Sequence, residues 1–190
     1  MCSSDLALSP GIDRRDSAIA RILEEKSRVG VPVVGDIEIF AQTVAARDKK
    51  PKIAAITGTN GKTTVTSMTG AMCKAAGMDC EIAGNISPAV LDAWMRREAS
   101  GSMPDSWVLE LSSFQLESTD SLRADCAAVL NVTEDHLDRH GTMDAYANAK
   151  ARIFNGQGTQ VLNRDDARCV AMAQDRKSTR LNSSHITISY

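Results

Sequence analysis

A glycine-rich segment with a lysine and two threonines is the part of the sequence best suited to chemistry. It reads AITGTNGKTT over residues 55–64 and follows an apolar run typical of a buried strand. Glycines at such a bend let backbone N–H groups converge on an anion, and a helix beginning near Lys62 adds its positive N-terminal end. Lys62 can reach phosphate oxygens, while Thr63 offers a hydroxyl to Mg²⁺. The pattern predicts a phosphate-binding loop made of Gly58, Thr59, Asn60, Gly61, Lys62, Thr63 and Thr64.

This match to the common pattern G-x-x-x-x-G-K-[ST] is incomplete. Ile56 stands where that pattern has its first glycine, and an ordinary glycine-rich turn with a surface lysine is the alternative. The segment after Lys62 has apolar residues at helical spacing, which predicts a helix with a core-facing stripe. That stripe would consist of Val65, Met68, Met72 and Ala76.

Polar residues stand where each later apolar run ends. Asn85 follows CEIAG, Ser112 follows WVLEL and Asn131 follows CAAVL. Because the carboxyl ends of parallel strands share one edge of a sheet, these side chains are expected along one crevice. Glu110 lies inside the run SWVLELSSF, where a carboxylate needs a cation or several donors. Mg²⁺ shared with Thr63 would meet that need, and a partly exposed glutamate paired with a basic residue is the alternative.

The segment NVTEDHLDRHGTMDAYANAKARIF, residues 131–154, supplies two further candidates. His136 is a candidate metal ligand, the alternative being a hydrogen-bonded histidine near a helix start, and His140 stays unassigned. Lys150 shares a helical stripe with Tyr146 and Ile153, so it either faces inward for chemistry or snorkels to the surface. Burial lowers the pKa of a lysine, and the neutral amine can take up CO₂ as a carbamate, which is an anionic metal ligand.

The elements that must position these residues alternate between short apolar runs and helix-length segments from residue 52 to about residue 173. The runs are KIAAIT, DCEIA, SWVLEL, CAAVLNV and TQVLN, and several are apolar on consecutive residues, as in strands covered on both faces. The alternation predicts an α/β fold with a largely parallel sheet and flanking helices. Before it, we expect a helix over SAIARILEEKSR, a short strand VPVV and a helix after Gly35.

Composition limits the class of protein. The chain of 190 residues is 43% hydrophobic, carries a net charge of −2 and has five cysteines without a CxxC pair. These values favour a cytoplasmic protein with reduced thiols and give no case for binding nucleic acid or a membrane. No secretory signal and no apolar run of the roughly 18 residues that span a bilayer is expected. The end of the chain, DRKSTRLNSSHITISY, lacks periodicity, so residues 176–190 are expected to be a non-native or a naturally disordered tail.

Several motifs in consistent order resemble those of the Mur ligases, over about residues 6–173. They are SPGI, GDIE, TGTNGKTT, LELSSFQLE and NVTEDHLDRHGTMDAYANAKARIF, and the fourth resembles the D-glutamate-adding branch of that family. The resemblance also accounts for Ile56, because the phosphate loop of this family lacks the first glycine. It implies an incomplete central ATP-binding domain over residues 51–175. Residues 1–50 would be the C-terminal remnant of a UDP-substrate domain plus a linker.

The resemblance implies a reaction as well. ATP would phosphorylate the carboxylate of UDP-N-acetylmuramoyl-L-alanine, and D-glutamate would attack this acyl phosphate, in a monomeric enzyme of peptidoglycan synthesis. Because a closing C-terminal domain is missing, the chain alone is expected to bind nucleotide weakly at most and not to complete ligation. Another Mur-type ligase, a folylpolyglutamate synthase, or an ATP-binding module without catalysis are the alternatives.

The residue roles that the resemblance implies fall into three groups. Lys62 would hold ATP phosphates, and Thr63 with Glu110 would ligate a first Mg²⁺. His136 and a carbamylated Lys150 would serve a second Mg²⁺, which makes Lys62, His136 and Lys150 the catalytic set. Substrate contacts would come from Ser9, Pro10 and Gly11 at the uridine diphosphate, and from Asn85, Ser112 and Gln115 at the muramoyl-alanine end. Thr64, Asn131 and Asp135 would lie nearby.

Overall fold

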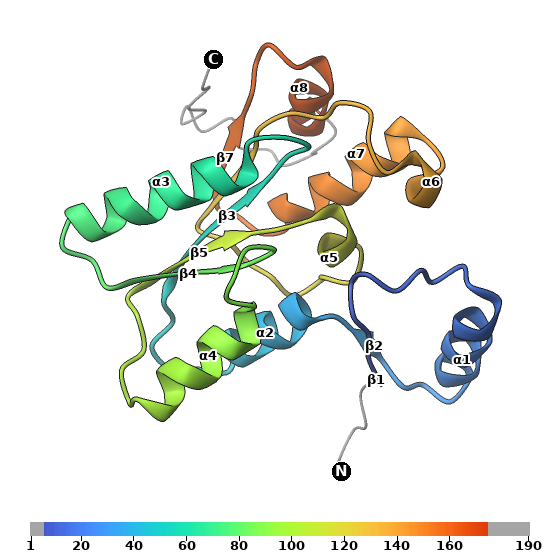
Figure 1. The fold of residues 1–190 in the computed structure, drawn as a ribbon, viewed down its shortest axis with the longest axis horizontal. Helices are drawn as coiled ribbons and strands as arrows, with labels where there is room; N and C mark the ends of the chain where they lie inside the picture. The colour runs from blue at the N-terminus through green and yellow to red at the C-terminus, as the bar shows by residue number, and fades with distance from the viewer. Residues whose placement is uncertain (1–5, 175–190) are drawn as a thin grey trace.

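The computed structural model describes residues 6–174, which contain two parallel sheets (Figure 1). The smaller sheet pairs β1 (Leu6–Ala7) with β2 (Val33–Val34). The larger sheet has the strand order β4-β5-β3-β6-β7, and all of its neighbouring strands are parallel. Its strands are β3 (Lys52–Thr57), β4 (Cys80–Gly84), β5 (Ser106–Glu110), β6 (Cys126–Val129) and β7 (Thr159–Leu162). The predicted α/β fold with a largely parallel sheet is confirmed, while the expected tail over 176–190 lies outside the described residues.

Two of the helices begin at a side-chain cap that hydrogen-bonds the first turn. Asp16 accepts a hydrogen bond from Ala18 N (2.9 Å) at the start of α1, and Thr142 accepts one from Ala145 N (3.1 Å) at the start of α7. The predicted helix over SAIARILEEKSR is confirmed as α1, and the helix expected after Gly35 is α2. The helices are α1 (Ser17–Arg28), α2 (Asp36–Ala45), α3 (Lys62–Ala75), α4 (Val90–Ala99), α5 (Ser113–Glu117), α6 (Leu137–His140), α7 (Met143–Ala151) and α8 (Ala167–Gln174), with the 3-10 turn η1 (Arg152–Phe154).

The large sheet is covered on both faces, as its apolar strands predict. Figure 1 shows α3 on one side and α2 with α4 on the other. Along β5, Trp107 and Leu109 belong to the larger core cluster, which also contains Phe40 of α2, whereas Val108 belongs to a smaller cluster against which Val65 of α3 packs. Side chains alternate between the faces of a strand, so each face receives its own core.

The apolar stripe expected on α3 is confirmed at Val65, which packs against the smaller core cluster, and is wrong for the other three residues. Met68 and Met72 have 59% and 62% of their surface exposed, and Ala76 is also exposed. The face that meets the sheet instead contains the buried Thr66 and Gly70. A Cβ at Gly70 would lie 2.3 Å from Ile82 Cδ1, so close packing on β4 selects the side of the helix with small residues. Hydrophobicity alone did not predict this rotation.

Gly84, the last residue of β4, should be the costliest glycine to replace beside the site. Its φ is +116°, and a Cβ there would lie 2.2 Å from Glu110 O of the paired strand. Gly84→Ala should therefore lower the free energy of unfolding by about 3 kcal/mol in urea denaturation. Gly77→Ala is the matched control, because Gly77 also has a positive φ (+80°) but no atom within 4 Å of its Cβ position, and it should cost about 1 kcal/mol. Equal losses in the two variants would contradict the predicted clash.

Candidate functional site

The loop between β3 and α3 has the backbone of an anion-binding site. Gly61 adopts the left-handed conformation (φ 79°) as the N-cap of α3, which then continues for 14 residues. The first N–H groups of a helix have no partner within it and lie at the positive end of its dipole. The predicted phosphate loop, residues 58–64, therefore turns these donors toward the carboxyl edge of the sheet, where β3 ends.

Asn131, which follows β6, holds this loop in shape. Its Oδ1 accepts hydrogen bonds from Thr59 N (3.0 Å) and Asn60 N (2.8 Å), and its Nδ2 donates to Asn60 O (3.1 Å). Thr59 is held further, because its Oγ1 accepts from Thr133 N (3.1 Å) and lies 3.2 Å from Tyr146 Oη. The sequence placed Asn131 nearby without a role, and its position directly after a buried strand was the available signal. Protein contacts thus brace the loop.

Two lysine side chains meet on one carbonyl of the loop. Lys62 Nζ donates to Gly58 O (3.1 Å) and Thr59 O (2.9 Å), and Lys150 Nζ donates to the same Gly58 O (2.9 Å). Lys150 is 1% exposed, and its Nζ lies 4.5 Å from the centre of the Tyr146 ring. The inward orientation of Lys150 is confirmed, and the snorkelling alternative is wrong. Burial, with the nearby charge of Lys62, lowers the pKa of Lys150 to about 7.

Glu110 is a buried carboxylate with one oxygen that has no hydrogen-bond partner. It ends β5 in register with Ile56 of β3, two residues before the loop, and is 2% exposed. Its Oε1 accepts from Asn85 Nδ2 (2.9 Å), whereas its buried Oε2 has no hydrogen-bond partner. A buried polar atom without a partner costs about 1–3 kcal/mol. The alternative of a partly exposed, paired glutamate is wrong, and the arrangement fits a cation.

His136 combines an exposed ring with a strained backbone. It is the one non-glycine residue with positive φ (52°) within residues 6–174, and such a conformation costs about 1–3 kcal/mol. Its side chain is 47% exposed, and its ring centre lies 4.8 Å from that of Phe114 and 6.2 Å from that of Tyr146. Since Lys150 contacts the same Tyr146 ring, both lie at the carboxyl edge of the sheet. The Nε2 atom of His136 lies 3.5 Å from Asp135 Oδ2, and the half-exposed ring can be reached from solvent.

The ring of His140, in contrast, is buried and bound to other side chains. Its Nε2 lies 3.0 Å from Ser113 Oγ and its Nδ1 lies 3.2 Å from Glu117 Oε1, so both ring nitrogens have partners. Its side chain is 3% exposed, and burial lowers its pKa. His140 therefore belongs to the packing between α5 and α6 rather than to a metal site.

A metal ion at this edge would need ligands beyond ordinary side chains. Within residues 6–174, no three His, Cys, Asp or Glu side chains are grouped so that they could hold a metal ion by themselves. The Glu110 carboxylate and the Thr63 hydroxyl are oxygen donors of the type that Mg²⁺ prefers, and phosphate oxygens would have to complete its coordination. Lys150 would add an anionic oxygen ligand only as a carbamate.

The predicted substrate residues differ in how accessible their polar groups are. Residues 9–12 form a turn after β1, closed by Ile12 N donating to Ser9 O (3.1 Å), and Pro10 O accepts from Arg139 Nη1 (3.2 Å). Asn85 is exposed beside Glu110. Ser112 and Gln115 form the capping box of α5 instead, and these two side chains are occupied by each other.

Gln115 is the least accessible residue of the predicted substrate set. It is 4% exposed, and its Nε2 donates to Asp36 Oδ2 (3.0 Å). Its Oε1 accepts from Ser112 N (3.1 Å). Its contribution, as placed, is to hold the start of α5, and a direct substrate contact by Gln115 stays a prediction.

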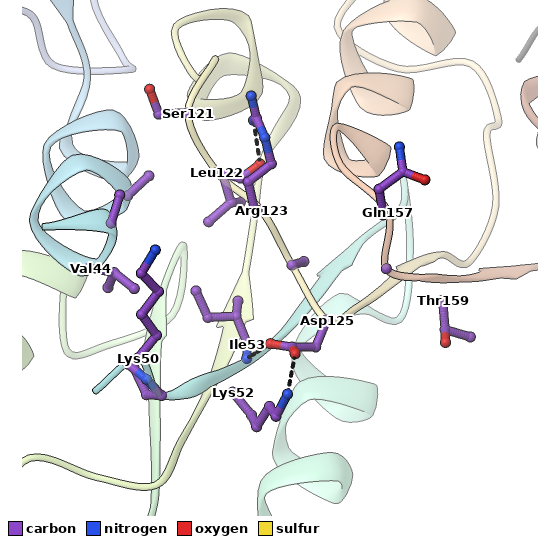
Figure 2. Close-up of a pocket in the computed structure, with 15 residues that line it drawn as sticks. Val44, Lys50, Lys52, Ile53, Ser121, Leu122, Arg123, Asp125, Gln157 and Thr159 are labelled. Carbon is purple, nitrogen blue, oxygen red and sulfur yellow. Dashed lines mark hydrogen bonds and ion pairs between the residues drawn. The ribbon is translucent and has the colours of Figure 1, made fainter. Parts of the chain in front are cut away.

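A hollow of about 610 Å³ lies at the other edge of the sheet (Figure 2). It is bordered by α2, by the start of β3, and by residues 121–125 and 157–159. Figure 2 shows Asp125 beside the start of β3, where it accepts from Lys52 Nζ (2.7 Å) and Ile53 N (2.9 Å). None of the predicted site residues lines this hollow. Lys50, which does, is therefore a control position for lysine substitutions in the loop.

Comparison with known proteins gives a consistent result. A model of the Mur ligase middle domain matches residues 56–189. The UDP-N-acetylmuramoylalanine–D-glutamate ligase of Nitrosospira multiformis is 60% identical over 164 residues, which cover 85% of this chain and 34% of that protein. The enzyme of the same name from Chromobacterium violaceum is 56% identical over 169 residues, covering 89% of this chain and 36% of that protein.

A solved structure extends the likeness to three dimensions. The structure of a UDP-N-acetylmuramoyl-L-alanyl-D-glutamate–2,6-diaminopimelate ligase superposes with a TM-score of 0.58 at 25% identity. That match covers 90% of this chain and 43% of the other. The chain spans about a third of the length of the two bacterial ligases named above.

Proposed function

The chain belongs to the Mur ligase family, and from that premise we propose that it carries the nucleotide- and metal-binding part of a D-glutamate-adding ligase. The reaction is ATP-dependent amide formation between D-glutamate and UDP-N-acetylmuramoyl-L-alanine, in the cytoplasm, by a monomer. The observation that carries the proposal is the buried, partnerless oxygen of Glu110 beside the phosphate loop. A buried carboxylate oxygen without a hydrogen-bond partner is costly, and a bound cation would remove that cost.

The loop and its lysines act on the nucleotide. The N–H groups at the start of α3 and the ammonium group of Lys62 face the triphosphate, and Lys62 exchanges its loop carbonyls for phosphate oxygens. Lys62 therefore orients the γ-phosphoryl group and stabilises the charge that develops on it during transfer to the alanyl carboxylate. That transfer breaks the bond between the β- and γ-phosphates, releases ADP and leaves an acyl phosphate. The amine of D-glutamate then displaces phosphate and forms the amide.

Metal binding falls to four side chains of this chain. Thr63 and Glu110 would hold a first Mg²⁺, and His136 with the carbamate of Lys150 would serve a second. When bound, Mg²⁺ offsets the repulsion between the phosphates and the attacking carboxylate. Lys150 is suited to carbamate formation because its amine is buried and its pKa is lowered to about 7, so a large share is neutral at pH 7.

The remaining residues divide by domain. Residues 1–50 act as the end of a uridine-nucleotide domain plus linker, and residues 51–175 as the ATP-binding domain. Ser9, Pro10 and Gly11 border the uridine diphosphate, while Asn85, Ser112 and Gln115 lie toward the muramoyl-alanine end. The exposed position of Asn85 supports its part in this assignment.

A hybrid ligase tests the proposal. In it, residues 6–174 replace the matching segment of the Nitrosospira multiformis enzyme, to which the chain is 60% identical. Phosphate release should require ATP, UDP-N-acetylmuramoyl-L-alanine and D-glutamate together, at a rate within about tenfold of the host enzyme. A folded hybrid that binds ATP without this release would favour a binding module, and release with a folate and L-glutamate would favour a folylpolyglutamate synthase.

Glu110→Gln in the same hybrid tests whether the partnerless oxygen of Glu110 binds a cation. The amide has the size of the carboxylate but no charge, so the Mg²⁺ concentration for half-maximal phosphate release should rise about tenfold. The matched control is Glu81→Gln, whose buried carboxylate is paired with Arg96 and Arg97 (2.6 Å each) near the start of β4, at the opposite end of the strands from the loop. An unchanged Mg²⁺ requirement in Glu110→Gln would remove Glu110 from the metal site.

A further inference from the structure

Arg139 contacts two separate parts of the molecule, the turn over residues 9–12 and helix α5, although no role was expected for it. Its side chain is 10% exposed. Nη1 donates to Pro10 O (3.2 Å) and Nη2 donates to Glu117 Oε2 (3.0 Å), while the guanidinium carbon lies 4.4 Å from the centre of the Phe114 ring. A planar guanidinium group has five donors and an aromatic-binding face, so it can make all three contacts at once.

Each of these contacts leads to a part of the proposed site. Pro10 is in the turn assigned to the uridine diphosphate, and Glu117 ends α5, which begins at the Ser112 cap. Arg139 itself is in α6, whose N-cap is His136. Within residues 6–174, the bond from Arg139 is the hydrogen bond that ties residues 9–12 to α6. One side chain therefore joins the nucleotide-sugar turn to the proposed metal ligand.

The helix that carries Arg139 depends on such contacts for its position. α6 has four residues, and a single helical turn is unstable by itself. His136, at its start, has the left-handed backbone and packs on Phe114 at 4.8 Å, the ring on which Arg139 also stacks. A displacement of the Arg139 guanidinium group therefore alters the packing on Phe114, against which the His136 ring also rests.

We propose that Arg139 is a positioning residue that couples the binding of the UDP-sugar substrate at Pro10 to the orientation of His136. The inference rests on the proposed function and adds to it a path between the two binding regions. Coupling of this kind is reciprocal, so the ATP–Mg²⁺ site and the UDP-sugar site must strengthen each other by the same factor. Lysine at position 139 keeps the charge but cannot bind the carbonyl, the carboxylate and the ring together.

The experiment measures that coupling by calorimetry in the hybrid ligase. The dissociation constant of UDP-N-acetylmuramoyl-L-alanine is determined with and without Mg²⁺ and a non-hydrolysable ATP analogue. The unsubstituted hybrid should show at least about fivefold tighter binding with them, a typical coupling factor. Arg139→Lys should bring this factor close to one and weaken the binding of the UDP-sugar substrate about tenfold. The affinity for the ATP analogue measured without the UDP-sugar should be unchanged.

Arg152→Lys is the matched control, because Arg152 also secures α5 but contacts neither residues 9–12 nor α6. Its Nε donates to Leu116 O (2.7 Å), and its Nη2 donates to Thr119 O (3.0 Å). This variant should keep the coupling factor even where it lowers thermal stability. Equal loss of coupling in both variants, or retained coupling in Arg139→Lys, would overturn the inference.

Hydrogen exchange in the unsubstituted hybrid provides a test that does not depend on the folding of any variant. Binding of UDP-N-acetylmuramoyl-L-alanine alone should slow amide exchange over residues 136–141, and unchanged exchange there would also overturn the inference. An unsubstituted hybrid that binds the substrate with coupling but does not ligate would instead refute the proposed function. The two failures are therefore distinguishable.

Discussion

Replacement of Lys62 by alanine should reduce ligation by the hybrid at least about a thousandfold. In the structure its ammonium group is held by two loop carbonyls, at 3.1 and 2.9 Å, where the β3–α3 loop opens toward the edge of the sheet. Removal of this charge leaves the transferring phosphoryl group without its cationic partner, while the braced loop and the start of α3 keep their shape. The measurements are kcat for phosphate release and the dissociation constant of Mg²⁺-ATP.

Lys50→Ala is the control for this result. Lys50 lines the hollow at the opposite edge of the sheet, so its loss should leave both quantities unchanged. Normal turnover in Lys62→Ala would eliminate the role assigned to Lys62. A loss of nucleotide affinity in Lys50→Ala instead would move the nucleotide to the hollow in Figure 2.

Lys150→Ala should lower kcat at least about a hundredfold, and acetate or formate should restore part of the lost activity. The truncated side chain leaves a space in the buried wall of the site, because Lys150 is 1% exposed and packs on Tyr146. A short carboxylate that enters this space supplies the anionic oxygens that the carbamate would have provided. Lys150→Arg, which keeps the positive charge but cannot form a carbamate, should be inactive without rescue.

Carbamate formation itself can be followed with ¹³C-labelled bicarbonate by NMR. Burial lowers the pKa of Lys150 to about 7, so the amine is mostly protonated and unreactive below pH 7 and mostly neutral above it. The carbamate signal should therefore rise as the pH increases through about 7, and it should be absent from Lys150→Arg. A fully active Lys150→Ala variant would rule out the carbamate.

Most of the sheet could be predicted because its signals are local. Each strand is a short apolar run, and polar residues mark the carboxyl ends of the central strands, so Glu110 and the phosphate loop were expected along the same edge. Lys150 could be placed inward from its spacing relative to Tyr146 and Ile153. All of these inferences need only a few neighbouring residues.

The errors and omissions concern contacts between distant segments. Beyond Val65, the predicted buried face of α3 was wrong because that face is set by the fit of Gly70 against Ile82, which hydrophobicity does not record. Asn131 lacked a role because its partner Asn60 lies 71 residues away, and Arg139 was missed because Pro10 lies 129 residues away. The spacing of residues within one segment gives no information on contacts such as Asn131 with Asn60 or Arg139 with Pro10.

The brace that Asn131 provides has a consequence for nucleotide capture. A loop that hydrogen bonds already hold in one shape loses little chain entropy when a ligand binds. Capture of the triphosphate should then proceed at a rate set by diffusional encounter and charge, rather than by a search among loop conformations.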